Sequence, residues 1–82
     1  MKELNEKLKN IKNFENLKSL EEEIESLGEG LLLRTKRAKW HIFGFTDLGN
    51  GYVHYLLSDG VSTRKQKYTD LYKYIEVSNR AR

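Results

Sequence analysis

Apolar residues recur every three or four positions through the first 27 residues, which is the spacing of one face of an amphipathic helix. One stripe consists of Leu4, Leu8 and Ile11, and the next of Leu17, Leu20, Ile24 and Leu27. The stripes are out of phase across residues 13–16, so the segment is either one helix with a shift or a hairpin of two helices. Ser19 followed by Glu22 fits a capping box and favours a second helix that begins there. Gly28 is expected to end a helical segment that spans residues 1–28.

Beyond Gly30 the apolar spacing shortens to two, which is the period of a half-buried β-strand. Three candidate strands cover residues 38–46, 52–58 and 61–67, and the first two are rich in aromatic and β-branched residues. The dipeptides Asn50-Gly51 and Asp59-Gly60 are typical of tight hairpin turns. The pattern therefore predicts an antiparallel sheet, three-stranded or four-stranded, over residues 31–67.

The end of the chain allows two interpretations. One helical stripe is formed by Tyr68, Leu71, Tyr72 and Ile75. Residues 71–77 also suit a strand, because Tyr, Ile and Val favour sheets. We prefer a C-terminal helix over residues 68–78, followed by a frayed tail at 79–82. The predicted fold class is α+β in a single domain (1–82), with an N-terminal helix or helical hairpin, the sheet and the C-terminal helix.

Turn geometry also predicts which residues face each other across the sheet. A two-residue turn at Asp59-Gly60 sets the last hairpin, whose facing pairs are Tyr52–Lys67, His54–Lys65 and Tyr55–Arg64. In the preceding hairpin, a loop at residues 47–50 places Ile42 opposite Tyr55 and Phe45 opposite Tyr52. A slip of one residue in that loop would exchange the two faces of the strand that contains Trp40.

This register gives the sheet two faces of different character. The apolar face, which is expected to be the core, carries Trp40, Ile42, Val53, Tyr55 and Leu57. The opposite face combines aromatic rings with cations and carries Arg37, Lys39, His41, Phe43, Phe45, Tyr52, His54, Lys65 and Lys67. Because bases stack on rings and cations neutralise phosphates, this is the combination that a nucleic-acid-binding sheet needs.

The charge of the chain is divided between its two parts. Residues 1–30 hold five Lys and eight Glu, a net charge of −3, and residues 31–82 hold ten Lys or Arg and four Asp or Glu, a net charge of +6. The two sum to the +3 of the whole chain. The basic part contains the predicted sheet, which favours contact with a polyanion.

Other chemistry finds little support in the sequence. There is no cysteine, and His41 and His54 have no third ligand at metal spacing. Asp47, Asp59 and Asp70 suit turns and a helix start rather than acid–base catalysis. We therefore expect no enzyme, no metal and no cofactor. The chain has no apolar signal-peptide core and no apolar run near the ~20 residues of a membrane span, which is typical of a cytoplasmic protein.

Two functions remain. The first is a small non-enzymatic nucleic-acid-binding module, for DNA or RNA. The alternative is a small phage-type accessory protein that inhibits a host or defence complex, for example of CRISPR type, that processes nucleic acids. Apolar positions in residues 4–27 also suggest a homodimer. In outline, strands followed by a helix over residues 38–78 resemble the DNA-reading amino-terminal domains of some integrases.

Overall fold

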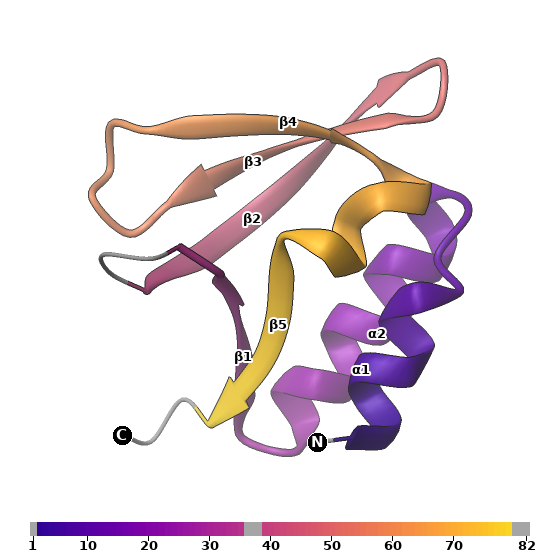
Figure 1. The fold of residues 1–82 in the computed structure, drawn as a ribbon, viewed down its shortest axis with the longest axis vertical. Coiled ribbons are helices and arrows are strands. Elements are labelled where there is room, and N and C mark those ends of the chain that lie inside the picture. Colours follow the sequence, from indigo (N-terminus) through magenta and orange to yellow (C-terminus); the bar gives the residue numbers. More distant parts are fainter. Residues whose placement is uncertain (1, 36–38, 80–82) are drawn as a thin grey trace.

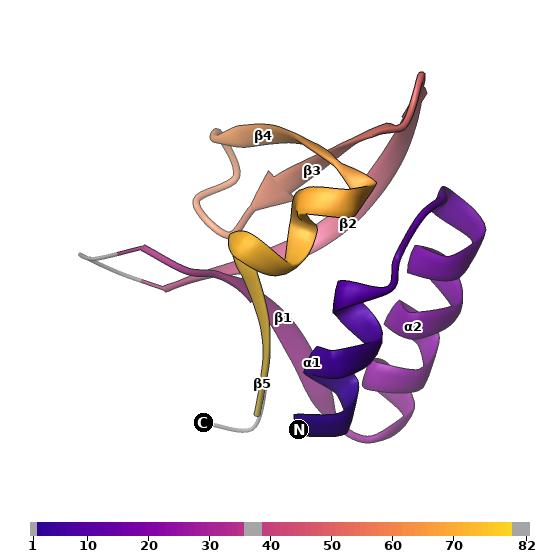
Figure 2. The same ribbon diagram turned by 45° about the vertical axis from the view of Figure 1, so that its right-hand side comes forward.

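The computed structural model describes residues 2–35 and 39–79 and is shown in Figure 1. Its elements are α1 (Lys2–Lys9), α2 (Phe14–Ser26), β1 (Glu29–Leu33), β2 (Trp40–Gly49), β3 (Tyr52–Leu57), β4 (Thr63–Lys67), the 3-10 helix η1 (Tyr68–Lys73) and β5 (Ile75–Asn79). The five strands form one antiparallel sheet in the order β4-β3-β2-β1-β5, which curls into a half-barrel. Figure 2 shows α1 and α2 side by side next to β1 and β5, with β2, β3 and β4 extending beyond them. The α+β class is confirmed, with five strands in place of three or four.

The helical segment is a hairpin of two helices, and the second begins earlier than predicted. The side chain of Asn13 accepts a hydrogen bond from the backbone N–H of Asn16 at 2.9 Å, and so caps the first turn of α2. A start at Ser19 is therefore wrong, because Ser19 lies inside α2. Gly28 follows the helix with a φ of +75°, the left-handed conformation that ends helices, as predicted. Within the described residues, neither helix is long and apolar enough to cross a membrane.

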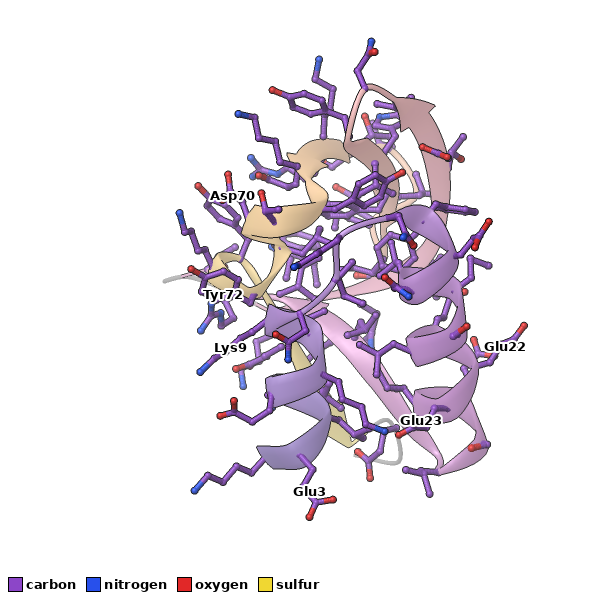
Figure 3. All side chains as sticks on the ribbon, turned by 90° about the vertical axis from the view of Figure 1, so that its right-hand side faces the viewer. Glu3, Lys9, Glu22, Glu23, Asp70 and Tyr72 are labelled. Atoms are coloured by element: carbon purple, nitrogen blue, oxygen red, sulfur yellow. The ribbon has the colours of Figure 1, made fainter. Side chains whose placement is uncertain are left out.

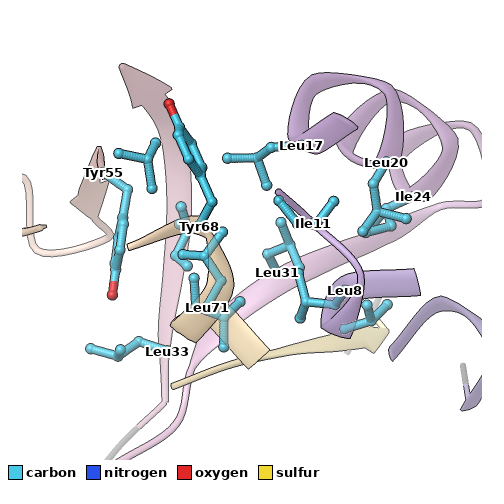
Figure 4. Packing of buried hydrophobic residues seen from close by; sticks show 14 of the residues in the cluster. Leu8, Ile11, Leu17, Leu20, Ile24, Leu31, Leu33, Tyr55, Tyr68 and Leu71 are labelled. Atoms are coloured by element: carbon cyan, nitrogen blue, oxygen red, sulfur yellow. The ribbon is translucent and has the colours of Figure 1, made fainter. Parts of the chain in front are cut away.

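The apolar stripes of α1 and α2 are buried together with residues of the sheet and of η1 (Figure 4). Leu17 and Leu71 are fully enclosed, and Tyr55 is the largest of the fully buried side chains. Leu27 is an exception at 60% exposed, because it caps α2 rather than continuing the stripe. The apolar surface that suggests a homodimer through residues 4–27 is thus mostly covered within one chain. The homodimer stays a prediction.

The predicted C-terminal helix over residues 68–78 is wrong. Only the short η1 forms, and β5 follows it and pairs along the whole of β1. Ile75 and Val77 are buried in the core, whereas Glu76 between them is half-buried, so the alternation of a strand decides the structure of this segment. Without the helix, the outline similarity to integrase domains does not hold. Of the predicted tail, Asn79 belongs to β5 and residues 80–82 lie outside the described residues.

The hairpin of β3 and β4 has the predicted register. Tyr52 faces Lys67, His54 faces Lys65 and Tyr55 faces Arg64. In the turn, the carboxylate of Asp59 accepts hydrogen bonds from the backbone N–H groups of Val61 and Ser62 at 2.9 and 2.7 Å. The Asp-Gly dipeptide therefore predicts the register correctly, although β3 ends at Leu57 and β4 begins at Thr63, so the connection is longer than the predicted two-residue turn.

The predicted register of β2 against β3 is wrong. β2 continues to Gly49, and the turn is made by Asn50 and Gly51, both with positive φ, rather than by a loop at residues 47–50. Two shifts of register interrupt the pairing, one between Asp47 and Gly49 and the other between Ile42 and Gly44. Each is a β-bulge, in which one strand carries an extra residue.

The two bulges decide which side chains reach the core. Beyond a bulge, each side chain of the strand points to the face opposite the one it would otherwise occupy. A second bulge therefore restores the original alternation. Ile42 therefore lies on the predicted core side and faces Leu57, although its predicted partner was Tyr55. Between the bulges the sides are exchanged, and Phe45 faces Tyr55 instead of Tyr52. The predicted core face is confirmed: Ile42, Val53, Tyr55 and Leu57 are buried, and Trp40 packs against them half-buried.

Asp47 ties the β2–β3 turn to the core. Its carboxylate accepts hydrogen bonds from the backbone N–H of Gly49 at 3.0 Å and from the hydroxyl of Tyr68 in η1. The hydrogen bond from Tyr68 is the main cause that lowers the pKa of Asp47, and the N–H of Gly49 lowers it further. Burial, followed by the hydrogen bond to Asp47, raises the pKa of Tyr68 to about 12.

Tyr68→Phe should lower the urea midpoint at neutral pH, and the difference from wild type should shrink in acid. A carboxyl whose pKa is depressed in the folded protein stabilises the fold above its ordinary pKa of about 4. That contribution is lost as the pH falls towards the folded-state pKa, where protonation removes the charge. Urea melts of both proteins at about pH 7 and about pH 3 measure the effect. The hydrogen bond from Ser62 lowers the pKa of Asp59 as well. Asp59 is unchanged in both proteins, so its titration cancels in the difference and serves as the internal control. A midpoint difference that stays constant on acidification would contradict the role of Asp47.

Candidate nucleic-acid interface

We call the face of β2, β3 and β4 that turns away from the hydrophobic core the outer face. Side chains alternate between the two sides of a strand, so register and burial together identify the members of this face. They are Gly44, Thr46, Gly49, Tyr52, His54, Leu56, Thr63, Lys65 and Lys67. Phe43, the extra residue of a bulge, has no partner in the register and joins this face because it lines the same hollow. All of them are exposed or half-buried. The outer face therefore combines rings, apolar side chains, hydroxyls and cations, and none of its members is acidic.

Tyr52 gathers two cations on the outer face. The Nζ atoms of Lys65 and Lys67 lie 5.0 and 5.9 Å from the centroid of its ring. Lys67 faces Tyr52 directly across the strands, and Lys65 is its diagonal neighbour, so the contacts follow from the register. A ring face attracts an ammonium group within about 6 Å, which lets two like charges stand close together. We call Tyr52, Lys65 and Lys67 the cation cluster.

A shallow hollow lies beside the cation cluster. Its volume is about 350 Å³, and it is lined by Phe43, Gly44, Phe45, Thr46, His54, Tyr55, Leu56 and Thr63. Phe43 stands at a bulge and is 61% exposed, and Leu56 is 38% exposed. Such apolar exposure on one small surface is typical of an interaction site.

Two other predicted residues lie outside β2–β4 or at the start of β2. Lys39, just before β2, forms an ion pair with Glu76 of β5, with 3.1 Å between the two groups. Exposed ion pairs contribute little to stability, so Lys39 can exchange this carboxylate for a phosphate. His41 faces Leu32 of β1 and is half-buried. His54 faces Thr46, five residues along β2 from His41, so roughly 15 Å of strand separates the two histidines.

Phe45 and Arg37 complete the predicted set. Phe45 is not on the outer face: it packs on the core side, with its ring centroid 5.9 Å from that of Tyr55. The bulge at Phe43 and the later bulge at Asp47 place it there. Arg37 lies outside the described residues. Of the nine predicted residues, the outer face thus brings together Phe43, Tyr52, His54, Lys65 and Lys67.

Carboxylates gather on the helices instead. Figure 3 shows Glu22 projecting outward from α2 and Glu23 between the two helices, with Lys9 and Glu3 projecting from α1. Glu23 pairs with Lys7 at 2.7 Å, and Glu21 pairs with Lys18 at 2.7 Å. The helices pack on the core side of the sheet, although Glu21 and Glu25 of α2 line a small hollow that Phe43 also lines. The outer face itself has cations and no carboxylate among its members.

The outer face has members that were not among the predicted site residues. Leu56 alternates with Tyr52 and His54 along β3, and Thr63 faces Leu56 from β4, so strand alternation alone identifies both. Gly44 and Thr46 could not be found in this way, because the bulge that turns them outward has no unambiguous sequence signal.

Within residues 2–35 and 39–79, no three His, Cys, Asp or Glu side chains gather as a metal site needs. Comparison of the chain with protein-family models, curated proteins and solved structures finds no match.

Proposed function

We propose that the chain is a small, cytoplasmic, non-enzymatic nucleic-acid-binding module that uses the outer face of β2–β4. The observation that carries the proposal is the cation cluster on a face of β2–β4 whose members include no carboxylate, together with the hollow on that face that the exposed Phe43 lines. Lys65 and Lys67 would neutralise phosphates and release their counterions. Phe43 would stack on a base, which is a sequence-tolerant contact because every base has a ring face.

The cation cluster also supports the proposal through its preorganisation. The two lysines are held at one ring before any ligand arrives, so less side-chain freedom is lost when a phosphate binds. Tyr52 then acts by positioning the two ammonium groups. Lys39 extends the positive surface towards β1 once it releases Glu76.

A second candidate function is inhibition of a nucleic-acid-processing protein complex, as a phage-type accessory protein would do. The favourable observation is that Phe43 and Leu56 are exposed beside the same hollow. Aromatic and apolar anchors at the centre of a polar rim are typical of protein interfaces. An acidic patch on such a complex would complement Lys65 and Lys67.

Binding of the wild-type protein to labelled oligonucleotides tests the first proposal. We expect fluorescence anisotropy to detect binding at about 50 mM salt and a weaker complex at about 200 mM. With two phosphate contacts, log affinity should fall with log salt with a slope of about 1.4 to 1.8. Circular dichroism on the same sample verifies the fold. A folded protein that binds neither single strands nor duplexes at low salt would contradict the proposal and favour the second candidate.

A further inference from the structure

The hollow on the outer face indicates which form of nucleic acid the protein takes. We propose that it receives one unpaired base, so that the ligand is a single strand rather than a duplex. This depends on the function proposed above and adds the substrate class to it. The proposal combines the shape and lining of the hollow with the position of the cation cluster.

The size of the hollow fits one flat ring system. At about 350 Å³ it is at the lower end of small-molecule sites, which measure roughly 300–1,000 Å³. Phe43 and Leu56 supply apolar surface for the faces of a base, and His54 supplies a further ring. The hydroxyls of Thr46 and Thr63 can donate to and accept from polar atoms on its edges.

Gly44 leaves the floor of this hollow open. A Cβ atom built on Gly44 would meet nothing within 4 Å, and its φ is not in the positive region that favours glycine. Neither crowding nor the backbone therefore requires glycine at this position. Because a glycine inside a strand weakens it, the fold would tolerate a larger residue here. A side chain at Gly44 would, however, occupy the space that a base needs.

The neighbouring cations select a nucleic acid as the occupant. His54, in the lining, faces Lys65 on β4, and paired strands lie about 4.8 Å apart. A base in the hollow thus brings the phosphates of its own strand next to Lys65 and Lys67. In a duplex the faces of the bases are covered by their neighbours, so exposing one requires unstacking that costs free energy. A single strand offers the base without that cost.

Gly44→Val separates base binding from phosphate binding. The probes are a labelled single strand of about 12 nucleotides, the same backbone without bases, and the matching duplex. We expect wild type to bind the single strand at least about tenfold more tightly than the strand without bases. Gly44→Val should lose about tenfold for the single strand and keep its salt slope, because the lysines are unchanged. The affinity of Gly44→Ala for the single strand should lie between those of wild type and Gly44→Val. The thermal midpoint of both variants should not fall.

The outcomes distinguish this inference from the proposed function. If Gly44→Val binds the single strand as wild type does, or if wild type binds all three probes equally, the base-binding hollow is refuted while phosphate binding stands. If wild type binds none of them, both proposals fail. Should Gly44→Val not fold, the comparison of the normal strand with the strand lacking bases still decides, because it needs only the wild-type protein.

Discussion

Tyr55→Ala should come close to unfolding the protein, whereas Phe43→Ala should leave its urea midpoint almost unchanged. Both substitutions remove an aromatic ring from the same part of the sheet, so they form a matched pair. Tyr55 is 1% exposed and is the largest fully buried side chain, and it packs against Phe45. Phe43 is 61% exposed, so its removal opens no cavity.

The expected sizes of the two effects differ several-fold. Truncating a buried aromatic residue costs about 3–5 kcal/mol, since the lost contacts leave a cavity that relaxes only in part. A protein of this size has a free energy of unfolding of about 5–10 kcal/mol, so Tyr55→Ala removes a large share of it. Surface substitutions such as Phe43→Ala stay within about 0.5 kcal/mol. Urea melts at one pH measure both. If Phe43→Ala unfolds the protein and Tyr55→Ala barely shifts the midpoint, the core face and the outer face are reversed.

The parts of the fold that could be predicted depend on local signals. Asp59 and Gly60 fit one turn, so the facing of Tyr52 with Lys67 and of His54 with Lys65 followed from the sequence. The cation cluster was predictable for the same reason. The break between the two helices was visible in the phase of their apolar stripes, although the cap at Asn13 was not recognised.

The parts that could not be predicted depend on competing turns and on strand pairing between segments that are distant in sequence. Gly49, Asn50 and Gly51 all adopt positive φ, so several turns compete in that segment, and the sequence does not say which one forms. The bulge at Phe43 adds a second ambiguity, and together they misplaced Phe45. The segment after Lys73 becomes a strand because β1 pairs with it along its length. Because β1 is distant in sequence, the spacing of apolar residues within the segment itself does not reveal this pairing.

The double variant Lys65→Gln/Lys67→Gln should lose roughly 50- to 200-fold in affinity for a single strand at about 50 mM salt. Each phosphate contact adds about 0.7–0.9 to the slope of log affinity against log salt. Between about 1 M and about 50 mM salt, two lost contacts therefore give this factor, and the slope should fall by about 1.4 to 1.8. Both lysines are exposed, so the thermal midpoint should hardly change. Anisotropy titrations at several salt concentrations give the affinity and the slope together.

Lys2→Gln/Lys12→Gln is the matched control, since it lowers the net charge of +3 by the same two units, to +1, at exposed positions of the helical part. Its salt slope should stay that of wild type, because slope counts contacts and not net charge. Tyr52→Phe keeps the ring that holds the two ammonium groups and should bind as wild type, whereas Tyr52→Ala releases them and should weaken binding. If both double variants lose affinity and slope equally, the attraction comes from overall charge, and the outer face has no special part in it.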